Sequence, residues 1–182
     1  MVTARKLVTA DELYAMGDDQ RFELIDGELI EMAPVGEPHG ETLINLGSLL
    51  NRFVKERRLG KVVGGDIGVI VGRSPDTVLA PDVAFISTTR MRPRGEAEGF
   101  LTSAPDLAVE ILSPSNTSAE MAFKVSRYLA AGSRLVWVVD PKARTVVAYA
   151  PGREPLVFSA EANLTADDVL PGFTCRVAEL FD

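Results

Sequence analysis

The stretch "PDLAVEILSPSNTSAEMAFKVSRYLAAG", residues 105–132, predicts a strand followed by a helix. Its first part is an apolar run without alternation, which is typical of a central strand covered on both faces. Thr117 and Glu120 then form a capping box that begins the helix, and Gly132 is placed to end it. Because such a strand is buried, the acid within it, Glu110, needs a partner.

The composition indicates an ordinary folded protein. The 182 residues suit one domain, residues 1–182, with 46% hydrophobic and 25% charged residues. No segment approaches the roughly 18 uninterrupted apolar residues of a membrane span, and the N-terminus lacks the apolar region of a signal peptide. We therefore expect a cytoplasmic protein that has no contact with a membrane.

The counts of cysteine and histidine restrict the metal chemistry. A single cysteine, Cys175, permits neither an internal disulfide nor a cysteine-based zinc site. A single histidine, His39, excludes every site built on several histidines. Any metal ion must therefore rest mainly on carboxylates.

The charge argues against a general coat for nucleic acid. The net charge is −7, whereas binding to phosphates depends on Lys and Arg. A local basic cleft stays possible, because two groups of basic residues occur, namely Arg52, Lys55, Arg57, Arg58 and Lys61, and then Arg90, Arg92 and Arg94. Each also has a structural explanation, as the complement of a helix dipole and as a solvated loop.

The N-terminal part predicts a short helix and a hairpin. Thr9 and Glu12 form a capping box for a helix over residues 10–16, which Gly17 ends. The segment "RFELIDGELIEMA" then predicts two strands joined by the Asp-Gly pair at residues 26–27, which is favoured in type I′ turns.

A long helix and several strands follow. The helix is expected from near Pro38 to Leu59, ended by Gly60, with an inward stripe of His39, Leu43, Leu46, Leu50 and Phe53. Two strands are predicted at residues 61–72 and 78–87, and a further hairpin at residues 134–150. The segment from residue 170 onward has no clear pattern. We expect an α/β or α+β protein, with one or two helices packed on a mixed sheet of about six or more strands.

Asp82 is the better placed of two acids that could pair with Glu110. Asp106 lies on the same strand and face, but four residues separate the two by about 13 Å. Asp82 lies on a separate predicted strand that could pair beside Glu110, about 4.8 Å away, where two carboxylates could hold a hard cation. The alternative is that Asp82 only makes a Pro-Asp turn at the strand entry.

Lys124 lies in the second turn of the predicted helix. The helix must fold back over the sheet, and helical side chains slant toward the N-terminus, so the ammonium can approach Glu110. The alternative is an exposed ion pair between Glu120 and Lys124, which stabilises a helix by only about 0.3–0.5 kcal/mol.

Taken together, six segments resemble a known family. They are "FELIDGELIEMAP" at 22–34, His39, "PDVAFI" at 81–86, "VEILSPS" at 109–115, Lys124, and "AAGSRLVWVVDP" at 130–141. In this order they resemble the Uma2 family, labelled "putative restriction endonuclease", of the PD-(D/E)xK nuclease superfamily. The resemblance implies a restriction-endonuclease-like fold, with a central mixed sheet flanked by helices.

The resemblance also implies site residues. Asp82 and Glu110 match the signature acids, while Leu112 stands where the superfamily usually has a lysine. In the family that lysine lies on the following helix, where Lys124 matches it. Glu23 is implied as a further acid, although the sequence alone would make it an outward residue of a half-exposed strand. Glu120 stands where relatives usually have aspartate.

The implied chemistry is hydrolysis of DNA phosphodiesters with Mg²⁺ or Mn²⁺. Asp82, Glu110 and the backbone carbonyl of Ile111 would hold the ion, and Lys124 would orient water or stabilise the phosphate. His39 would contact the site or a phosphate, or else be a satisfied core histidine. A homodimer is expected by analogy, because cleavage of two strands benefits from two sites.

Two other functions stay open. A non-catalytic binding or assembly module on the same fold would make the acids and the lysine structural. A hydrolase of a smaller phosphate ester would need only a small pocket without a basic approach for a duplex.

Overall fold

The computed structural model describes residues 6–17, 21–93 and 98–182, and its centre is β7 (Leu107–Ile111). All five residues of β7 are buried. This strand pairs in parallel with β8 (Leu135–Asp140) and antiparallel with β6 (Val83–Ser87). The crossover between the parallel strands contains α3 (Ser118–Ala130), as such a connection requires. The predicted central strand and following helix are confirmed.

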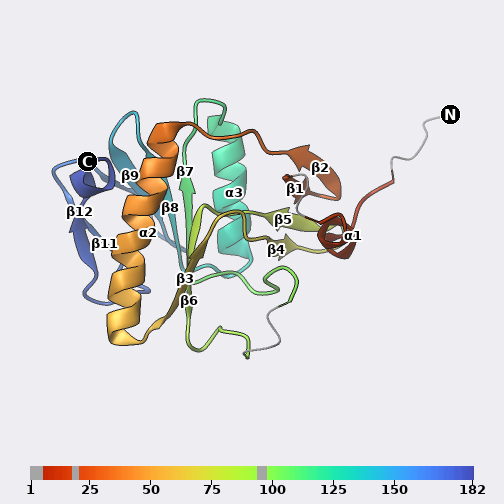
Figure 1. Ribbon diagram of the computed structural model, residues 1–182, viewed down its shortest axis with the longest axis horizontal. Coiled ribbons are helices and arrows are strands. Elements are labelled where there is room, and N and C mark those ends of the chain that lie inside the picture. Colours follow the sequence, from red (N-terminus) through yellow and green to blue (C-terminus); the bar gives the residue numbers. More distant parts are fainter. Residues whose placement is uncertain (1–5, 18–20, 94–97) are drawn as a thin grey trace.

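A mixed sheet of six strands surrounds β7 (Figure 1). Its order is β10 (Leu156–Phe158), β9 (Thr145–Tyr149), β8, β7, β6 and β3 (Gly60–Gly64). One face packs against α2 (Glu37–Arg57), and the other against α3, so the two helices lie on opposite sides of the strands in Figure 1. The expected α+β architecture, a central mixed sheet flanked by helices, is therefore present.

A smaller sheet lies beside α3 and has the order β2, β1, β5, β4. Its strands are β2 (Glu28–Glu31), β1 (Phe22–Ile25), β5 (Thr77–Leu79) and β4 (Val69–Gly72). Asp26 and Gly27 connect β1 to β2 with φ angles of 47° and 83°, the positive values that a type I′ turn needs. The short helix α1 (Ala10–Ala15) has the predicted capping box of Thr9 and Glu12 and covers the end of this sheet.

Two predicted strands are wrong, because each is divided between the two sheets. Residues 61–72 form β3 and β4, separated by a turn in which Gly65 and Asp66 have positive φ angles. Residues 78–87 form β5 and β6, separated at Ala80–Asp82, where Pro81 has no N–H for a ladder bond. The chain therefore crosses from one sheet to the other within each of these two segments.

The end of α2 also differs from the prediction. The helix ends at Arg57, and Arg58, not Gly60, has the left-handed conformation that closes it, with φ 55°. Gly60 is required for another reason, because a Cβ there would lie 2.0 Å from the carbonyl oxygen of Ile86 on the neighbouring strand. In the predicted stripe Leu46 and Leu50 are fully buried, whereas Leu43 and Phe53 are partly buried.

The C-terminal part of the chain, whose residues from 170 onward had no predicted structure, completes the core on the α2 side. It contains β11 (Asn163–Thr165), β12 (Thr174–Arg176) and a 3-10 helix at Val177–Leu180. Its side chains Leu164, Leu170, Val177 and Leu180 are fully buried in the same cluster as α2. No helix in the described part of the chain is long and apolar enough to cross a membrane.

Candidate active site

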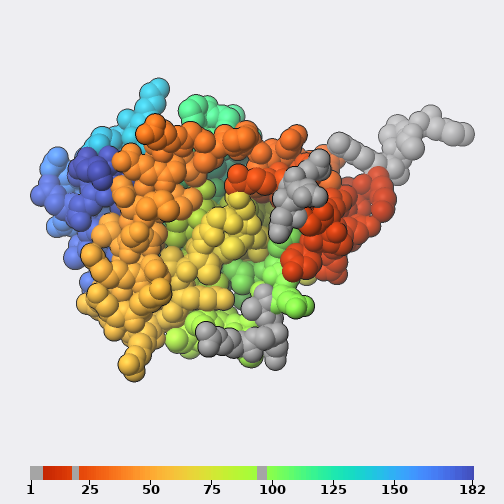
Figure 2. Space-filling model, viewed as in Figure 1, coloured from red at the N-terminus to blue at the C-terminus, as the bar shows by residue number. Residues whose placement is uncertain are grey.

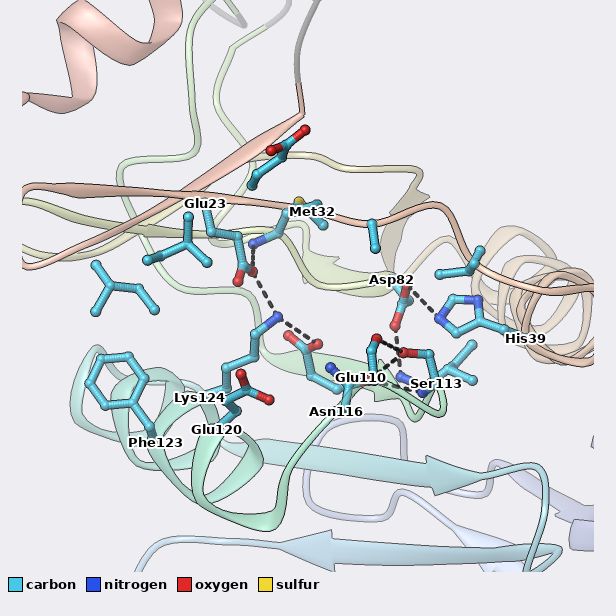
Figure 3. A pocket seen from close by; sticks show the side chains of 18 of the residues that line it. Glu23, Met32, His39, Asp82, Glu110, Ser113, Asn116, Glu120, Phe123 and Lys124 are labelled. Carbon is cyan, nitrogen blue, oxygen red and sulfur yellow. Dashed lines mark hydrogen bonds and ion pairs between the residues drawn. The ribbon is translucent and has the colours of Figure 1, made fainter.

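Lys124 connects two buried acids from different sheets. Its Nζ donates to Glu23 Oε1 at 2.8 Å and to Glu110 Oε2 at 3.1 Å (Figure 3). The predicted approach of Lys124 to Glu110 is thus confirmed, and the exposed pair with Glu120 is wrong, since the Lys124 side chain is only 13% exposed. Burial lowers the pKa of Lys124, but the carboxylates of Glu110 and Glu23 together raise it by more. The pKa of Lys124 therefore lies above its usual value.

Glu23 is buried and held in place by the neighbouring strand. Its side chain is 6% exposed, so the alternative of an outward residue on a half-exposed strand is wrong. Besides Lys124, its Oε1 accepts the backbone N–H of Ala80 at 2.9 Å. The pairing of β1 with β5 brings these residues together, because Leu24 stands opposite Val78.

Glu110 lies in the middle of the site with both carboxylate oxygens bonded. Tyr128 donates its hydroxyl to Oε1 at 2.7 Å, while Lys124 bonds to Oε2. Burial raises the pKa of Glu110 to about 7, and the negative charges of Asp82 and Glu23 add to this effect, against the lowering effect of Lys124. Glu110 therefore exchanges its proton near neutral pH.

Asp82 stands beside Glu110 at the entry to β6. Because β6 pairs antiparallel with β7, with Val83 opposite Val109, Asp82 reaches the end of β7, where its Oδ2 accepts the N–H of Ile111 at 2.7 Å. Its Oδ1 lies 3.2 Å from His39 Nε2. Asp82 is thus at a strand entry, as the turn interpretation predicts, and its carboxylate also belongs to this cluster.

His39 projects from the first turn of α2 toward Asp82 and is buried. Burial lowers its pKa, but the bond to Asp82, and then the backbone of Ile111, raise the pKa above its usual value overall. Its Nδ1 is buried without a hydrogen-bond partner among the residues that the structure describes. His39 is therefore more than a core histidine, because it takes part in the polar network of the acids.

A cavity of about 520 Å³ opens onto these side chains (Figure 3). The segment between β2 and α2 forms one wall, with Met32 and Val35, and the first turns of α3 form another, with Glu120 and Phe123. Glu120 does not bond to Lys124; its carboxylate accepts the N–H of Thr117 at 2.8 Å in the capping box. That bond lowers the pKa of Glu120.

The donor atoms fit a small hard cation. Glu23, Asp82 and Glu110 place three carboxylates against one lysine and one histidine, and carboxylate oxygen is what Mg²⁺ prefers. No three His, Cys, Asp or Glu side chains within residues 6–17, 21–93 and 98–182 form a ready metal cluster. An ion would therefore rest on Asp82 and Glu110 and complete its shell with a backbone oxygen and waters, as Mg²⁺ commonly does.

Tyr128 is the residue that sequence reasoning missed. It lies on the buried face of α3, four residues after Lys124. Its hydroxyl could have indicated a role in the site, because a tyrosine on a buried helix face needs a hydrogen-bond partner. Leu112, at the position of the superfamily's strand lysine, contributes its N–H to the carbonyl of Val139.

The two basic groups lie away from the cavity. His39 and Arg57 mark opposite ends of α2 and are about 27 Å apart along its axis. In Figure 2 the orange atoms of this part of the chain reach from the upper edge of the molecule to the lower edge. Arg90 and Arg92 bond to backbone carbonyls, those of Ala104 and Gly132 and those of Glu98 and Gly99. Arg94 lies outside the described residues. Arg90 and Arg92 are therefore structural, but as half-buried side chains that hold backbone carbonyls and not as the solvated loop residues that were expected.

The site combines an acid before one strand, a second acid within the antiparallel neighbour of that strand, and a lysine from the next helix. These residues lie on a mixed sheet between helices. Together these features define a restriction-endonuclease-like protein. The model of the Uma2 family, described as "Putative restriction endonuclease", matches residues 9–178. The chain therefore belongs to the Uma2 family.

A solved structure has the same fold. It is the crystal structure of a protein from Anabaena variabilis that is described as a "putative nuclease belonging to DUF820". It is 24% identical in sequence, with a TM-score of 0.84, and the match covers 96% of this chain and 97% of that one. None of the curated proteins matches this chain.

Proposed function

We propose that this protein is a metal-dependent endonuclease that hydrolyses phosphodiester bonds of DNA at the cavity of Asp82, Glu110 and Lys124. The observation that supports this most is the position of Lys124 Nζ, within hydrogen-bond distance of both Glu23 and Glu110. A buried ammonium beside surplus carboxylates is suited to a site where a cation and a phosphate meet. Membership of the Uma2 family supports the same function.

Asp82, Glu110 and the carbonyl of Ile111 are proposed to hold Mg²⁺ or Mn²⁺, which supplies a Lewis acid and lowers the pKa of bound water. Two bonds prepare the acids for this role. Ile111 N–H fixes Asp82 Oδ2, and Tyr128 fixes Glu110 Oε1, which leaves further lone pairs of these carboxylates free.

Lys124 is proposed to stabilise the negative charge that grows on the phosphate. It stays protonated at neutral pH because Glu110 and Glu23 raise its pKa. Glu23 acts through Lys124, as it holds the ammonium from the side opposite Glu110. His39 holds Asp82 Oδ1, and its raised pKa allows it to keep a proton on that contact.

Calorimetric titration of Mg²⁺ and Mn²⁺ tests the proposal, with cleavage of plasmid DNA and of single-stranded DNA assayed on the same samples. Asp82→Asn and Glu110→Gln should each lose metal binding and cleavage. Glu31→Gln is the matched control, because Glu31 also lines the cavity but is exposed on β2. It should keep both activities. Thermal melting of every variant separates loss of function from loss of fold.

Three outcomes would contradict the proposal. A wild-type protein that binds neither ion and leaves DNA intact would favour the binding or assembly module. Hydrolysis of bis(p-nitrophenyl) phosphate without any cleavage of DNA would favour a hydrolase of smaller esters. Cleavage that persists in both acid variants would place the reaction elsewhere.

The proposed enzyme works as a homodimer, because cleavage of both strands of a duplex benefits from two sites related by symmetry. Sedimentation velocity with and without DNA measures this directly. A species of 19.6 kDa alone, also on DNA, would contradict the dimer.

A further inference from the structure

We propose that the part of the cavity beside Phe123 holds one unstacked base, so that the substrate is DNA with an unpaired nucleotide at the cleavage point. The inference rests on the proposed nuclease function and names its substrate class. A single strand, a flap and a bulge all present such a nucleotide, whereas a continuous duplex does not.

Lys124 lies between two parts of the cavity. Figure 3 shows Asp82, Glu110 and His39 together on one side of Lys124, and Phe123, with Glu120 near it, on the other. The apolar lining residues are Ile25, Ile30, Met32, Ala33, Val35, Ala80, Ile111, Ala119 and Phe123. Ile30 and Val35 are 44% and 47% exposed, so apolar surface at the cavity is open to a ligand.

Phe123 is suited to stack against such a group. It directly precedes Lys124 on α3 and lines the cavity while remaining partly exposed. The guanidinium of Arg127 lies over its ring, 4.8 Å from the centroid, and Arg127 is itself bonded to Asp26 at 3.0 Å. This contact fixes the orientation of the ring. A fixed, partly exposed aromatic ring is what proteins use to bind unpaired bases.

The charges of the cavity exclude a row of phosphates. Five acids line it, Glu23, Glu31, Asp82, Glu110 and Glu120, against Lys124 and His39. Lys124 is already engaged by two of these acids, and neither described basic group lies at the cavity. A continuous duplex needs several basic contacts to its backbone. A single phosphate bound with its cation near the acids, together with one base near Phe123, would need fewer basic contacts.

The size of the cavity agrees with this occupant. A volume of about 520 Å³ lies in the range of pockets that enclose a small organic ligand. A paired base would first have to leave its stack, and this cost falls for a base that is mismatched or single-stranded. The cavity therefore favours DNA in which the base is already unpaired.

The test uses 2-aminopurine, a fluorescent base whose emission is quenched by stacking. It is placed next to one phosphate in three DNA forms of the same sequence, namely a single strand, a perfect duplex and a duplex with one unpaired nucleotide. Binding is measured by titration in Ca²⁺, and cleavage by gel in Mg²⁺. The proteins are wild type, Phe123→Ala, Phe123→Tyr and the control Tyr14→Ala, which removes an exposed aromatic ring outside this cavity.

We expect the wild type to bind and cut the two unpaired forms at least tenfold better than the perfect duplex, and to quench 2-aminopurine. Phe123→Ala should lose the quenching and weaken binding about tenfold. Phe123→Tyr, which keeps an aromatic ring, should retain the quenching, and Tyr14→Ala should behave as wild type. Folding is checked by thermal melting. If Phe123→Ala is unstable, Phe123→Leu takes its place, because it keeps the apolar bulk without an aromatic ring.

Cleavage of the perfect duplex as fast as the unpaired forms, with no change in 2-aminopurine emission, would overturn this inference and leave the nuclease function intact. Quenching that depends on Phe123 without cleavage would support the base site and overturn the hydrolysis. Absence of both binding and cleavage with all DNA forms would overturn both proposals.

Discussion

Glu110 is a buried acid whose ionisation is controlled by the residues that contact it. The sequence places it in an apolar strand, where ionisation is costly, and the fold brings Lys124 and Tyr128 to its two oxygens. These contacts do not fully offset burial and the charges of Asp82 and Glu23, so the pKa of Glu110 is raised to about 7. The residue is therefore balanced between its protonated and ionised forms at neutral pH.

This balance predicts an unusual dependence of stability on pH. The unfolded chain has a glutamate pKa near 4.5, so the folded protein holds this proton more tightly between pH 4.5 and about 7. Stability from this group therefore falls as the pH rises through that range, by an amount on the order of 3 kcal/mol. Glu110→Gln removes the effect. Urea unfolding in EDTA at several pH values should show the wild type losing stability relative to the variant; a constant difference would contradict the prediction.

Tyr128→Phe should destabilise the protein by about 1–3 kcal/mol, because Glu110 Oε1 is then buried without its donor. The hydroxyl lowers the pKa of Glu110, so its removal should also shift the pH range of declining stability upward. Tyr149→Phe, at a half-buried tyrosine of β9, is the control. Urea unfolding across pH 5–9 gives both quantities. Loss of stability without any shift along the pH axis would mean that Tyr128 only packs.

At the scale of elements, α3 places the ammonium of the site. Its beginning is fixed by Thr117, whose hydroxyl accepts the N–H of Glu120 at 3.2 Å, while Glu120 accepts the N–H of Thr117. Lys124 follows one turn later. The same motif begins α1, where Thr9 accepts from Glu12 at 3.1 Å, and neither residue lines the cavity. The capping box of α1 therefore serves as a control for the capping box of α3.

Thr117→Ala and Thr9→Ala should each lower the free energy of unfolding by about 1 kcal/mol. Only Thr117→Ala should also reduce DNA cleavage, by several fold, because fraying of the first turn of α3 displaces Lys124. Chemical denaturation and initial rates of cleavage give the two quantities. Equal rates for the two variants would show that Lys124 is held by Glu23 and Glu110 without help from the helix start.

Local signals in the sequence predicted most elements, because caps, turns and apolar runs act over a few residues. The hairpin at Asp26-Gly27, the helix after Thr117 and the buried strand around Glu110 are of this kind. The division of two strands between two sheets was missed, since Pro81 and the Gly64-Gly65 pair look like minor irregularities within apolar runs. The burial of Glu23 depends on the pairing of β1 with β5, which no local pattern reveals.

At the scale of the molecule, the charge distribution determines how the proposed DNA substrate would be bound. The net charge is −7, and both described basic groups lie away from the cavity. Binding should therefore depend on a divalent cation and only weakly on salt. We expect log K to fall with log salt concentration with a slope of about −1 to −2, as for one or two phosphate contacts. Fluorescence anisotropy between 50 and 200 mM KCl measures it, and a slope of about −5 or steeper would indicate a broad basic face instead.

The three residues Ala80–Asp82 carry the chain from the smaller sheet to the larger one, and both ends of this crossing serve the site. Ala80 N–H fixes Glu23, and Asp82 contacts Ile111 and His39. Lys124 then bonds to Glu23, which lies 101 positions earlier in the chain. Closing so long a loop comes late in folding. A chain still emerging from the ribosome therefore holds no finished cleavage centre, and the cell meets this chemistry only after both sheets have docked.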